Sequence, residues 1–119
     1  MPLFYEDWNN ETSELLLKCD AEVQNICKKL SQFDLSLVKS LKTHYESNTV
    51  EAMTQKISSI VGFKGITSPT VCVDGGYIPD FNSRYFTSDF SYELTILIQI
   101  ADFAGVKVPN MKDTLNWYY

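Results

Sequence analysis

The longest apolar run of the chain, from Phe90 to Ala104, constrains the fold more than any other feature. Its β-branched centre, residues 95–100, would also suit a strand. The uninterrupted length and the Gly105 that follows favour a helix instead. Apolar side chains cover most of the circumference of this helix and leave only a narrow polar stripe. We therefore expect a long helix that other elements nearly surround and bury.

Four further segments carry apolar residues three and four positions apart, the spacing of amphipathic helices. They run from Thr12 to Leu30, from Asp34 or Ser36 to about Asn48, from Asn48 to Gly62, and from Asn110 to Tyr118. Each begins at a residue that can cap a helix. Together with the long apolar helix, they predict an all-α fold, a compact bundle of about five helices.

Turn-forming and extended residues fill the stretch between Gly65 and Pro79. Val71 to Val73, before Asp74-Gly75, could form half of a hairpin, but no convincing second strand follows, so we expect one long loop or extended segment. The adjacent glycines do not form a phosphate cradle, because a dinucleotide fingerprint requires GxGxxG between a strand and a helix. No cofactor-binding residue is therefore assigned.

Composition restricts the class of protein. With 119 residues, of which 45% are hydrophobic, the chain can form one domain with a modest core. The net charge is −5 and the lysines are dispersed, which argues against a nucleic-acid partner. We see neither a leader peptide nor an apolar run of roughly 18 residues. We expect a cytoplasmic protein that does not interact with membranes.

Cysteine and histidine offer few sites for metal or nucleophilic chemistry. Cys19, Cys27 and Cys72 are odd in number and form no CxxC pair, so we expect reduced thiols packed as small hydrophobic side chains and no metal site. His44 is the single histidine. It lies beside an apolar face, where a packed or surface histidine is favoured over a ligand or base.

Asp20 interrupts the apolar face of the first predicted helix. Its carboxylate points toward apolar neighbours and needs a hydrogen-bond partner or an exposed edge. A structural partner, such as a backbone amide or a buried lysine, is favoured over a role in substrate binding.

The polar segment just before the long helix holds the only arginine, Arg84, five residues before Asp89. A guanidinium offers a planar pair of donors that matches a carboxylate. Close together in space, the two side chains would form a carboxylate-binding site with an acceptor beside it. The alternative is a pair of solvated charges or helix caps.

These residues also resemble a known family. The sequence Arg84-Tyr85-Phe86-Thr87-Ser88-Asp89, a hydrophobic helix, Gly105-Val106 and Pro109 resemble the carboxy-terminal helical domain of the octopine/nopaline (opine) dehydrogenases. The resemblance extends back through Phe63–Ile66, Pro69, Phe4–Glu6, Thr12 and Asp20–Glu22. Ser83 stands where the family has Asn, Ser88 replaces an acidic residue, and Val71–Phe81 is longer than usual.

The resemblance implies an NAD(P)-dependent oxidoreductase acting on CH–NH bonds, with a helical domain like the carboxy-terminal domain of 6-phosphogluconate dehydrogenase. Such an enzyme condenses an amino acid with a 2-oxo acid and reduces the imine. By the same resemblance, Arg84 and Tyr85 bind substrate, and Asp89 is the catalytic residue that holds a histidine. An aspartate at a helix amino terminus would be stabilised as an anion by the helix dipole.

The family's catalytic histidine belongs to a His-Pro segment that precedes this chain, as does the dinucleotide-binding domain; His44 does not match that segment. We therefore expect residues 1–119 to be the substrate domain, an expressed fragment or truncated product that is inactive alone. NAD or NADP would be bound mainly by the absent domain.

Two other hypotheses stay open. Crowded aromatic residues favour a non-catalytic helical module that forms a homodimer or docks a partner: Trp8, Phe90, Phe103, Trp117, Tyr118 and Tyr119. A helical domain from a related family that reduces other 2-oxo acids would also suit the spacing of Arg84 and Asp89.

Overall fold

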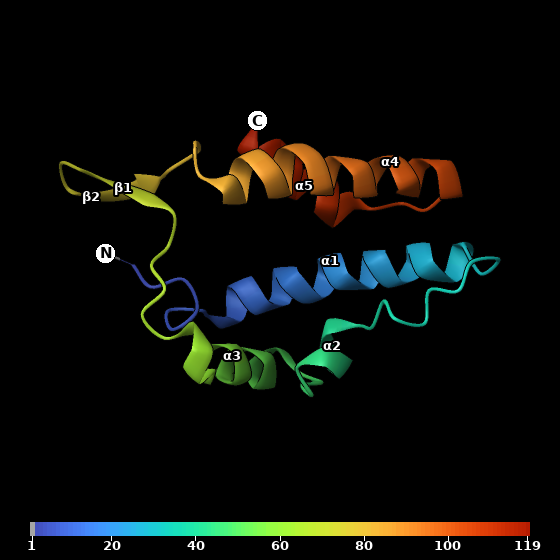
Figure 1. The fold of residues 1–119 in the computed structure, drawn as a ribbon, viewed down its shortest axis with the longest axis horizontal. Coiled ribbons are helices and arrows are strands. Elements are labelled where there is room, and N and C mark those ends of the chain that lie inside the picture. Colours follow the sequence, from blue (N-terminus) through green and yellow to red (C-terminus); the bar gives the residue numbers. More distant parts are fainter. Residues whose placement is uncertain (1) are drawn as a thin grey trace.

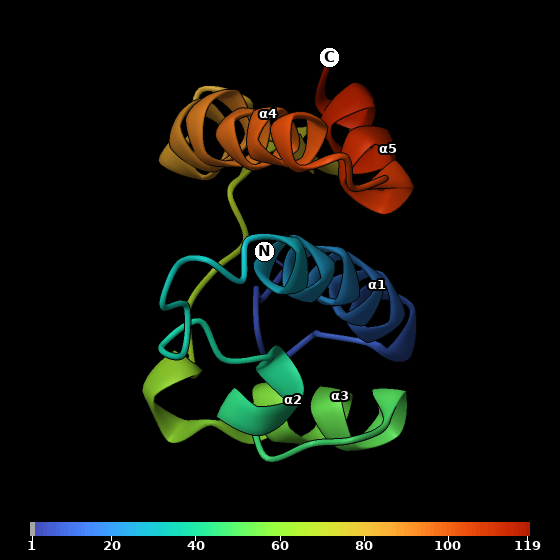
Figure 2. The ribbon, with the colours of Figure 1, turned by 90° about the vertical axis from the view of Figure 1, so that its right-hand side faces the viewer.

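The computed structural model describes residues 2–119 as three layers of helices stacked along one direction (Figures 1 and 2). The helices are α1 (Asn10–Lys29), α2 (Leu41–His44), α3 (Val50–Ser59), the 3₁₀ turn η1 (Val61–Phe63), the π-helix η2 (Tyr85–Leu94), α4 (Thr95–Ala104) and α5 (Pro109–Tyr118). Helix α1 lies between the layer of α4 and α5 and the layer of α2 and α3, as Figure 2 shows. The predicted all-α bundle of about five helices is confirmed.

The amino termini of α1 and α3 differ from the prediction by one or two residues. The side chain of Asn9 accepts a hydrogen bond from the backbone N–H of Thr12, so α1 begins two residues before Thr12. Thr49, rather than Asn48, caps α3 and accepts from the backbone N–H of Ala52. Adjacent residues at both helix starts can serve as caps, so the sequence alone did not determine which of them caps the helix.

The second helix is much shorter than predicted and begins after Ser40, whose hydroxyl accepts a hydrogen bond from the backbone N–H of Thr43. Asp34 instead accepts from the backbone N–H of Ser36 in an exposed turn, and this bonding lowers the pKa of Asp34. Leu37 is 91% exposed. Helical spacing alone was insufficient there, because Leu37 and Val38 remain exposed and gain little from packing.

The extended segment is a β-hairpin, so the expectation that no second strand follows is wrong. Strand β1 (Thr70–Val73) pairs antiparallel with β2 (Gly76–Pro79), in the register Thr70–Pro79 to Val73–Gly76. Gly75 and Gly76 adopt φ of 89° and 148°, which the tight turn requires. Strand β2 was not predicted because the Gly and Pro residues at its two ends are unfavourable in strands.

The long helix begins at Tyr85, five residues earlier than predicted, and passes without a break from η2 into α4. Its inner face is buried, with Ala101 at 0% exposure. The expectation that other elements nearly surround it is wrong for the outer face. There Ile96 and Phe103 are 48% and 86% exposed. None of the helices within residues 2–119 is both long and apolar enough to cross a bilayer.

The principal core forms where α1, α4 and α5 meet. Its buried side chains are Ile26, Ala101, Val108 and Met111. On the other side of α1, the fully buried Met53 and the nearly buried Ile57 form the inner face of α3. Helix α1 therefore contributes to both interfaces, and the layers depend on it.

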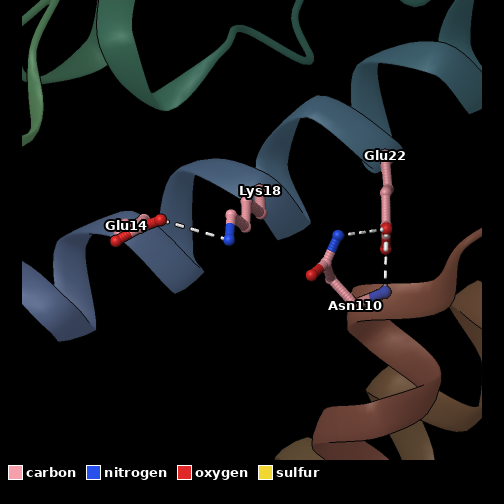
Figure 3. A network of polar contacts seen from close by, with 4 residues as sticks. All are labelled: Glu14, Lys18, Glu22 and Asn110. Carbon is pink, nitrogen blue, oxygen red and sulfur yellow. Dashed lines mark hydrogen bonds and ion pairs between the residues drawn. The ribbon is translucent and has the colours of Figure 1, made fainter.

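The carboxylate of Glu22, on α1, caps the amino terminus of α5 (Figure 3). Its oxygens accept hydrogen bonds of 2.9 Å from the backbone N–H groups of Asn110 and Met111 and from the side-chain amide of Asn110. Val108 has no side chain that could cap the helix, and Pro109 has no N–H. A buried carboxylate from another helix thus satisfies donors that α5 would otherwise leave unpaired.

A second buried polar contact joins the amino-terminal segment, α1 and α3. The indole Nε1 of Trp8 donates to the hydroxyl of Ser13 at 2.9 Å, and that hydroxyl lies 2.7 Å from the hydroxyl of Thr54. Ser13 is completely buried. Its small polar side chain therefore supports close packing of α1 against α3 and fixes the ring of Trp8.

The preference for a structural partner of Asp20 is confirmed. Its carboxylate accepts a hydrogen bond of 3.0 Å from the backbone N–H of Leu41, at the start of α2. His44 is exposed at the end of α2, with its ring edge against Tyr45. Both residues therefore belong to the contacts that hold or flank α2.

The three cysteines are unpaired, but they do not all pack as expected. Cys19 and Cys27 are half-buried, whereas Cys72 is exposed on β1, so the expectation of a packed thiol is wrong for Cys72. Burial raises the pKa of the Cys19 thiol, and the hydroxyl of Thr114, 4.0 Å away, partly offsets this effect. Cys19 is consequently a neutral thiol at physiological pH.

We expect Glu22→Ala to lower the free energy of unfolding by about 2 to 4 kcal/mol, because it leaves buried N–H donors of α5 without acceptors. Glu14→Ala is the matched control on the same helix, since Glu14 forms only an exposed ion pair with Lys18 (Figure 3). It should cost less than about 0.5 kcal/mol. Urea unfolding followed by circular dichroism measures both values; equal losses would contradict the capping role.

Candidate functional site

Arg84, Tyr85 and Asp89 line one surface cleft of about 550 Å³. Ser83, Ser88 and Glu93 complete its lining. Arg84 and Asp89, five residues apart in the sequence, therefore lie on one concave surface. All lining residues come from η2 and the two residues before it, so this chain forms one wall of the cleft.

The π-helix explains why residues five apart share this wall. In an α-helix, with about 3.6 residues per turn, Arg84 and Asp89 would point about 140° apart. In a π-helix each N–H bonds to the carbonyl five residues earlier, and the wider turn makes residues five apart point in more similar directions than in an α-helix. The change of helix type in η2 thus directs the guanidinium and the carboxylate to one side.

Ser83 organises the start of this helix. Its hydroxyl accepts a hydrogen bond from the backbone N–H of Tyr85, and its carbonyl accepts from Phe86 and Thr87. Because the helix begins here, Asp89 lies beyond the first turn. The expectation that Asp89 occupies the helix amino terminus is wrong, and stabilisation by the helix dipole falls mainly on the turn that precedes it.

The guanidinium of Arg84 is exposed and forms no ion pair with a carboxylate within the described chain. The ion pairs found among residues 2–119 are Glu14–Lys18 and Asp102–Lys112. The donors of Arg84 are therefore free to bind an anion that enters the cleft. Asp89, also exposed, offers acceptors on the same wall.

Aromatic side chains of the amino-terminal segment support Tyr85 from behind. Phe4 stacks on Tyr85 with ring centroids 5.2 Å apart, and Tyr5 stacks on Phe63 at 4.0 Å. Phe4 and Tyr5 also meet edge to face at 4.6 Å. The aromatic side chains of the amino-terminal segment, Phe4 and Tyr5, thus pack onto later elements of the chain. These aromatic contacts make one side of the site rigid.

Sequence reasoning did not identify Tyr5 as a neighbour of this site. Burial raises the pKa of the Tyr5 phenol, and the charges of Tyr85, Tyr45 and Asp89 raise it further. Tyr5 therefore keeps its proton at neutral pH. The only signal for Tyr5 in the sequence was its place in the aromatic amino-terminal segment, which the family resemblance also includes.

A second cavity, of about 560 Å³, lies on the other side of Tyr85 and Asp89, and both residues line it as well. The amino-terminal segment, α1, η2 and α5 form its walls. The remaining lining residues are Phe4, Trp8, Thr12, Leu15, Leu16, Cys19, Pro69, Phe86, Phe90, Thr114 and Trp117. Hydrophobic and aromatic side chains thus predominate.

The structure separates His44 from the Arg84 cleft. Helix α2, which carries His44, and the layer formed by η2 and α4 lie on opposite sides of α1 (Figures 1 and 2). The glycine pair Gly75–Gly76 closes the exposed β1–β2 turn and is not followed by a helix that could hold a phosphate. Within residues 2–119, this glycine pair therefore lacks the strand–loop–helix setting of a dinucleotide fingerprint.

Comparisons with known proteins show which proteins this chain resembles in sequence and in fold. Tauropine dehydrogenase of Arabella iricolor is 32% identical over 98% of this chain. Octopine dehydrogenase, solved with NADH and pyruvate and with NADH and L-arginine, is 29% and 28% identical over 98% of the chain, and its TM-score is 0.83 in both cases. The chain spans about a third of the length of these relatives, between 30% and 32%.

The family model described as "NAD/NADP octopine/nopaline dehydrogenase, alpha-helical domain" matches residues 1–119, the full length of the chain. The resemblance inferred from Arg84 to Asp89 and the hydrophobic helix is therefore confirmed. The three-layer helical fold and the similarity across 98% of the chain lead to the same assignment. This chain belongs to the octopine/nopaline dehydrogenase family, as its α-helical domain.

Proposed function

We propose that this chain is the substrate-binding domain of an opine-dehydrogenase-like oxidoreductase. In the proposed reaction, the amine of an amino acid attacks the carbonyl of a 2-oxo acid, water leaves, and the imine is reduced to a secondary amine. The observation that carries the proposal is the cleft in which the unpaired Arg84 lies beside Asp89. Pyruvate and L-arginine, found with the related octopine dehydrogenase, belong to these two substrate classes.

Arg84 binds the carboxylate of the 2-oxo acid in this proposal. Two parallel N–H donors of a guanidinium match the two oxygens of a carboxylate and fix its orientation as well as its position. Tyr85, whose ring is held by Phe4, lines the same cleft and contributes a phenol that can hydrogen-bond to substrate. The carbonyl carbon next to the bound carboxylate is thereby held over the face of η2.

Asp89 orients the imidazole of a histidine outside this chain. A carboxylate that accepts the N–H of an imidazole fixes its tautomer and stabilises its protonated form. The protonated imidazole can then deliver a proton to the reacting centre. His44 does not take this role, because α2 lies on the other side of α1 (Figure 2). Asp89 is thus the catalytic residue contributed by this chain.

A separate domain holds NAD or NADP in this proposal, and the match to the alpha-helical domain of an NAD/NADP dehydrogenase family supports this division. The reduced dinucleotide supplies the hydride when it is bound there. We propose that residues 1–119 are a single domain, that the chain alone is inactive, and that the enzyme is cytoplasmic. The two domains together would enclose the cleft, of which η2 is one wall.

Arg84→Ala in the full-length enzyme should raise KM for the 2-oxo acid by an amount that corresponds to about 2 to 4 kcal/mol, because a desolvated charge pair is lost. Arg84→Lys keeps the charge but loses the two-pronged geometry and should recover only part of the affinity. Lys56→Ala, on α3, is the control. Steady-state oxidation of the reduced dinucleotide measures all three variants. An unchanged KM in Arg84→Ala would refute the role of Arg84.

Asp89→Asn should lower kcat about 100-fold or more and leave KM for the 2-oxo acid nearly unchanged, since it disturbs proton transfer rather than carboxylate binding. Asp102→Asn provides a matched control, because Asp102 lies at the far end of the same long helix and is exposed. A loss of activity in both variants, or a change confined to KM, would contradict the proposal.

A second candidate function, homodimerisation, is favoured by the apolar outer face of η2 and α4. Its members are Tyr92, Ile96, Ile100 and Phe103, which are 69%, 48%, 37% and 86% exposed. Their spacing of three and four residues aligns them in one stripe. Exposed apolar stripes of this kind are typical of interfaces between proteins.

If this stripe forms a dimer, light scattering of the chain should show a concentration-dependent rise in mass to that of two copies. Ile96→Glu should abolish the rise, because it buries a charge in the interface. Val61→Glu is the control, since Val61 is 78% exposed on η1 and lies outside the stripe. A constant monomer mass at all concentrations would exclude the homodimer.

A further inference from the structure

The apolar cavity behind Tyr85 and Asp89 has no role in the carboxylate binding proposed for Arg84. Its volume of about 560 Å³ lies within the range of about 300–1,000 Å³ that is typical of small-molecule sites. Aromatic side chains from three elements enclose it: Trp8 from the amino-terminal segment, Phe86 and Phe90 from η2, and Trp117 from α5. A space of this size and lining can receive a sizeable apolar group.

Two residues connect this cavity to the Arg84 cleft. Tyr85 and Asp89 line both, so the two spaces adjoin along the same turn of η2. A substrate whose reacting carbon lies at Asp89 can therefore extend in two directions. One direction leads to the guanidinium of Arg84, and the other leads into the apolar cavity.

Two polar groups of the cavity wall are already hydrogen-bonded within the chain. The indole of Trp8 donates to Ser13, and the hydroxyl of Thr114 donates to the carbonyl of Asn110 at 2.8 Å. Asp89, at the boundary with the cleft, is the only charged lining residue. A guanidinium or sulfonate that lies among the aromatic side chains of the cavity, away from Asp89, would lose its hydration without gaining a charged partner, whereas a hydrocarbon side chain has no such hydration to lose.

We propose that this cavity receives the side chain of the amino acid substrate, and that this substrate has a large, uncharged, apolar side chain such as that of leucine or phenylalanine. The inference rests on the proposed function and specifies its amino donor. In the bound state, the substrate nitrogen lies next to Asp89 and its side chain lies against Phe90 and Trp117. Removal of such a side chain from water accounts for a preference of about 10- to 100-fold over a small or charged donor.

The first test measures kcat/KM of the full-length enzyme for L-leucine, L-alanine and L-arginine, with pyruvate as the fixed 2-oxo acid. L-Leucine should exceed the other two at least about 10-fold. Leu15→Asp places a carboxylate in the cavity wall, where Leu15 is 43% exposed and tolerates the change. This variant should lose activity with L-leucine and gain activity with L-arginine. Leu37→Asp, at a 91% exposed position outside the cavity, should change neither.

The second test does not depend on catalysis. The two tryptophans of the 119-residue chain, Trp8 and Trp117, both line the cavity, so intrinsic fluorescence reports on its occupancy. Titration with L-leucine should give a saturable change that L-alanine does not give and that Leu15→Asp removes.

The outcomes separate this inference from the proposed function. An active enzyme that prefers L-alanine or L-arginine overturns the apolar subsite and leaves the proposed function standing. A saturable fluorescence response to L-leucine in a protein inactive with every substrate pair supports the cavity as a binding site and overturns the dehydrogenase proposal. If the protein shows neither activity nor a fluorescence response, both the inference and the proposed function are overturned.

Discussion

The carboxylate of Glu22 is the interaction on which the arrangement of the layers depends. Helix α5 begins with Pro109 and has no cap of its own, so its first donors are satisfied by a side chain from α1. This contact fixes α5 against α1 beside the core of Ile26, Ala101 and Met111. Because α5 in turn packs on η2 through Trp117, the position of the candidate site depends on the same contact.

The candidate site is therefore built from the core outward. Helix α5 supports η2 from one direction, and the aromatic segment around Phe4 supports Tyr85 from another. Between these supports, Tyr85 and Asp89 form the boundary between a polar cleft and an apolar cavity. One short π-helical segment thus presents two chemically different surfaces, which suits a reaction that joins two different substrates.

Local patterns in the sequence predicted much of the fold, and the predictions that failed have a common cause. Apolar periodicity predicted the helices, and Asp20 was correctly expected to have a structural partner. The predicted second helix was too long because Leu37 and Val38, in its first part, remain exposed and meet no partner surface. Strand β2 was missed because its pairing with β1 outweighs the poor strand propensity of Gly76 and Pro79. In each case a tertiary contact, present or lacking, decided the outcome.

The sequence by itself determined that the chain is helical and that its only arginine precedes Asp89 by five residues at the start of a hydrophobic helix. Only the tertiary structure decided that these side chains share one wall, because α- and π-helical bonding place residues five apart in different directions. It also decided the role of Glu22, whose hydrogen-bond partners lie 88 and 89 residues away. Contacts over such separations leave no local pattern in the sequence.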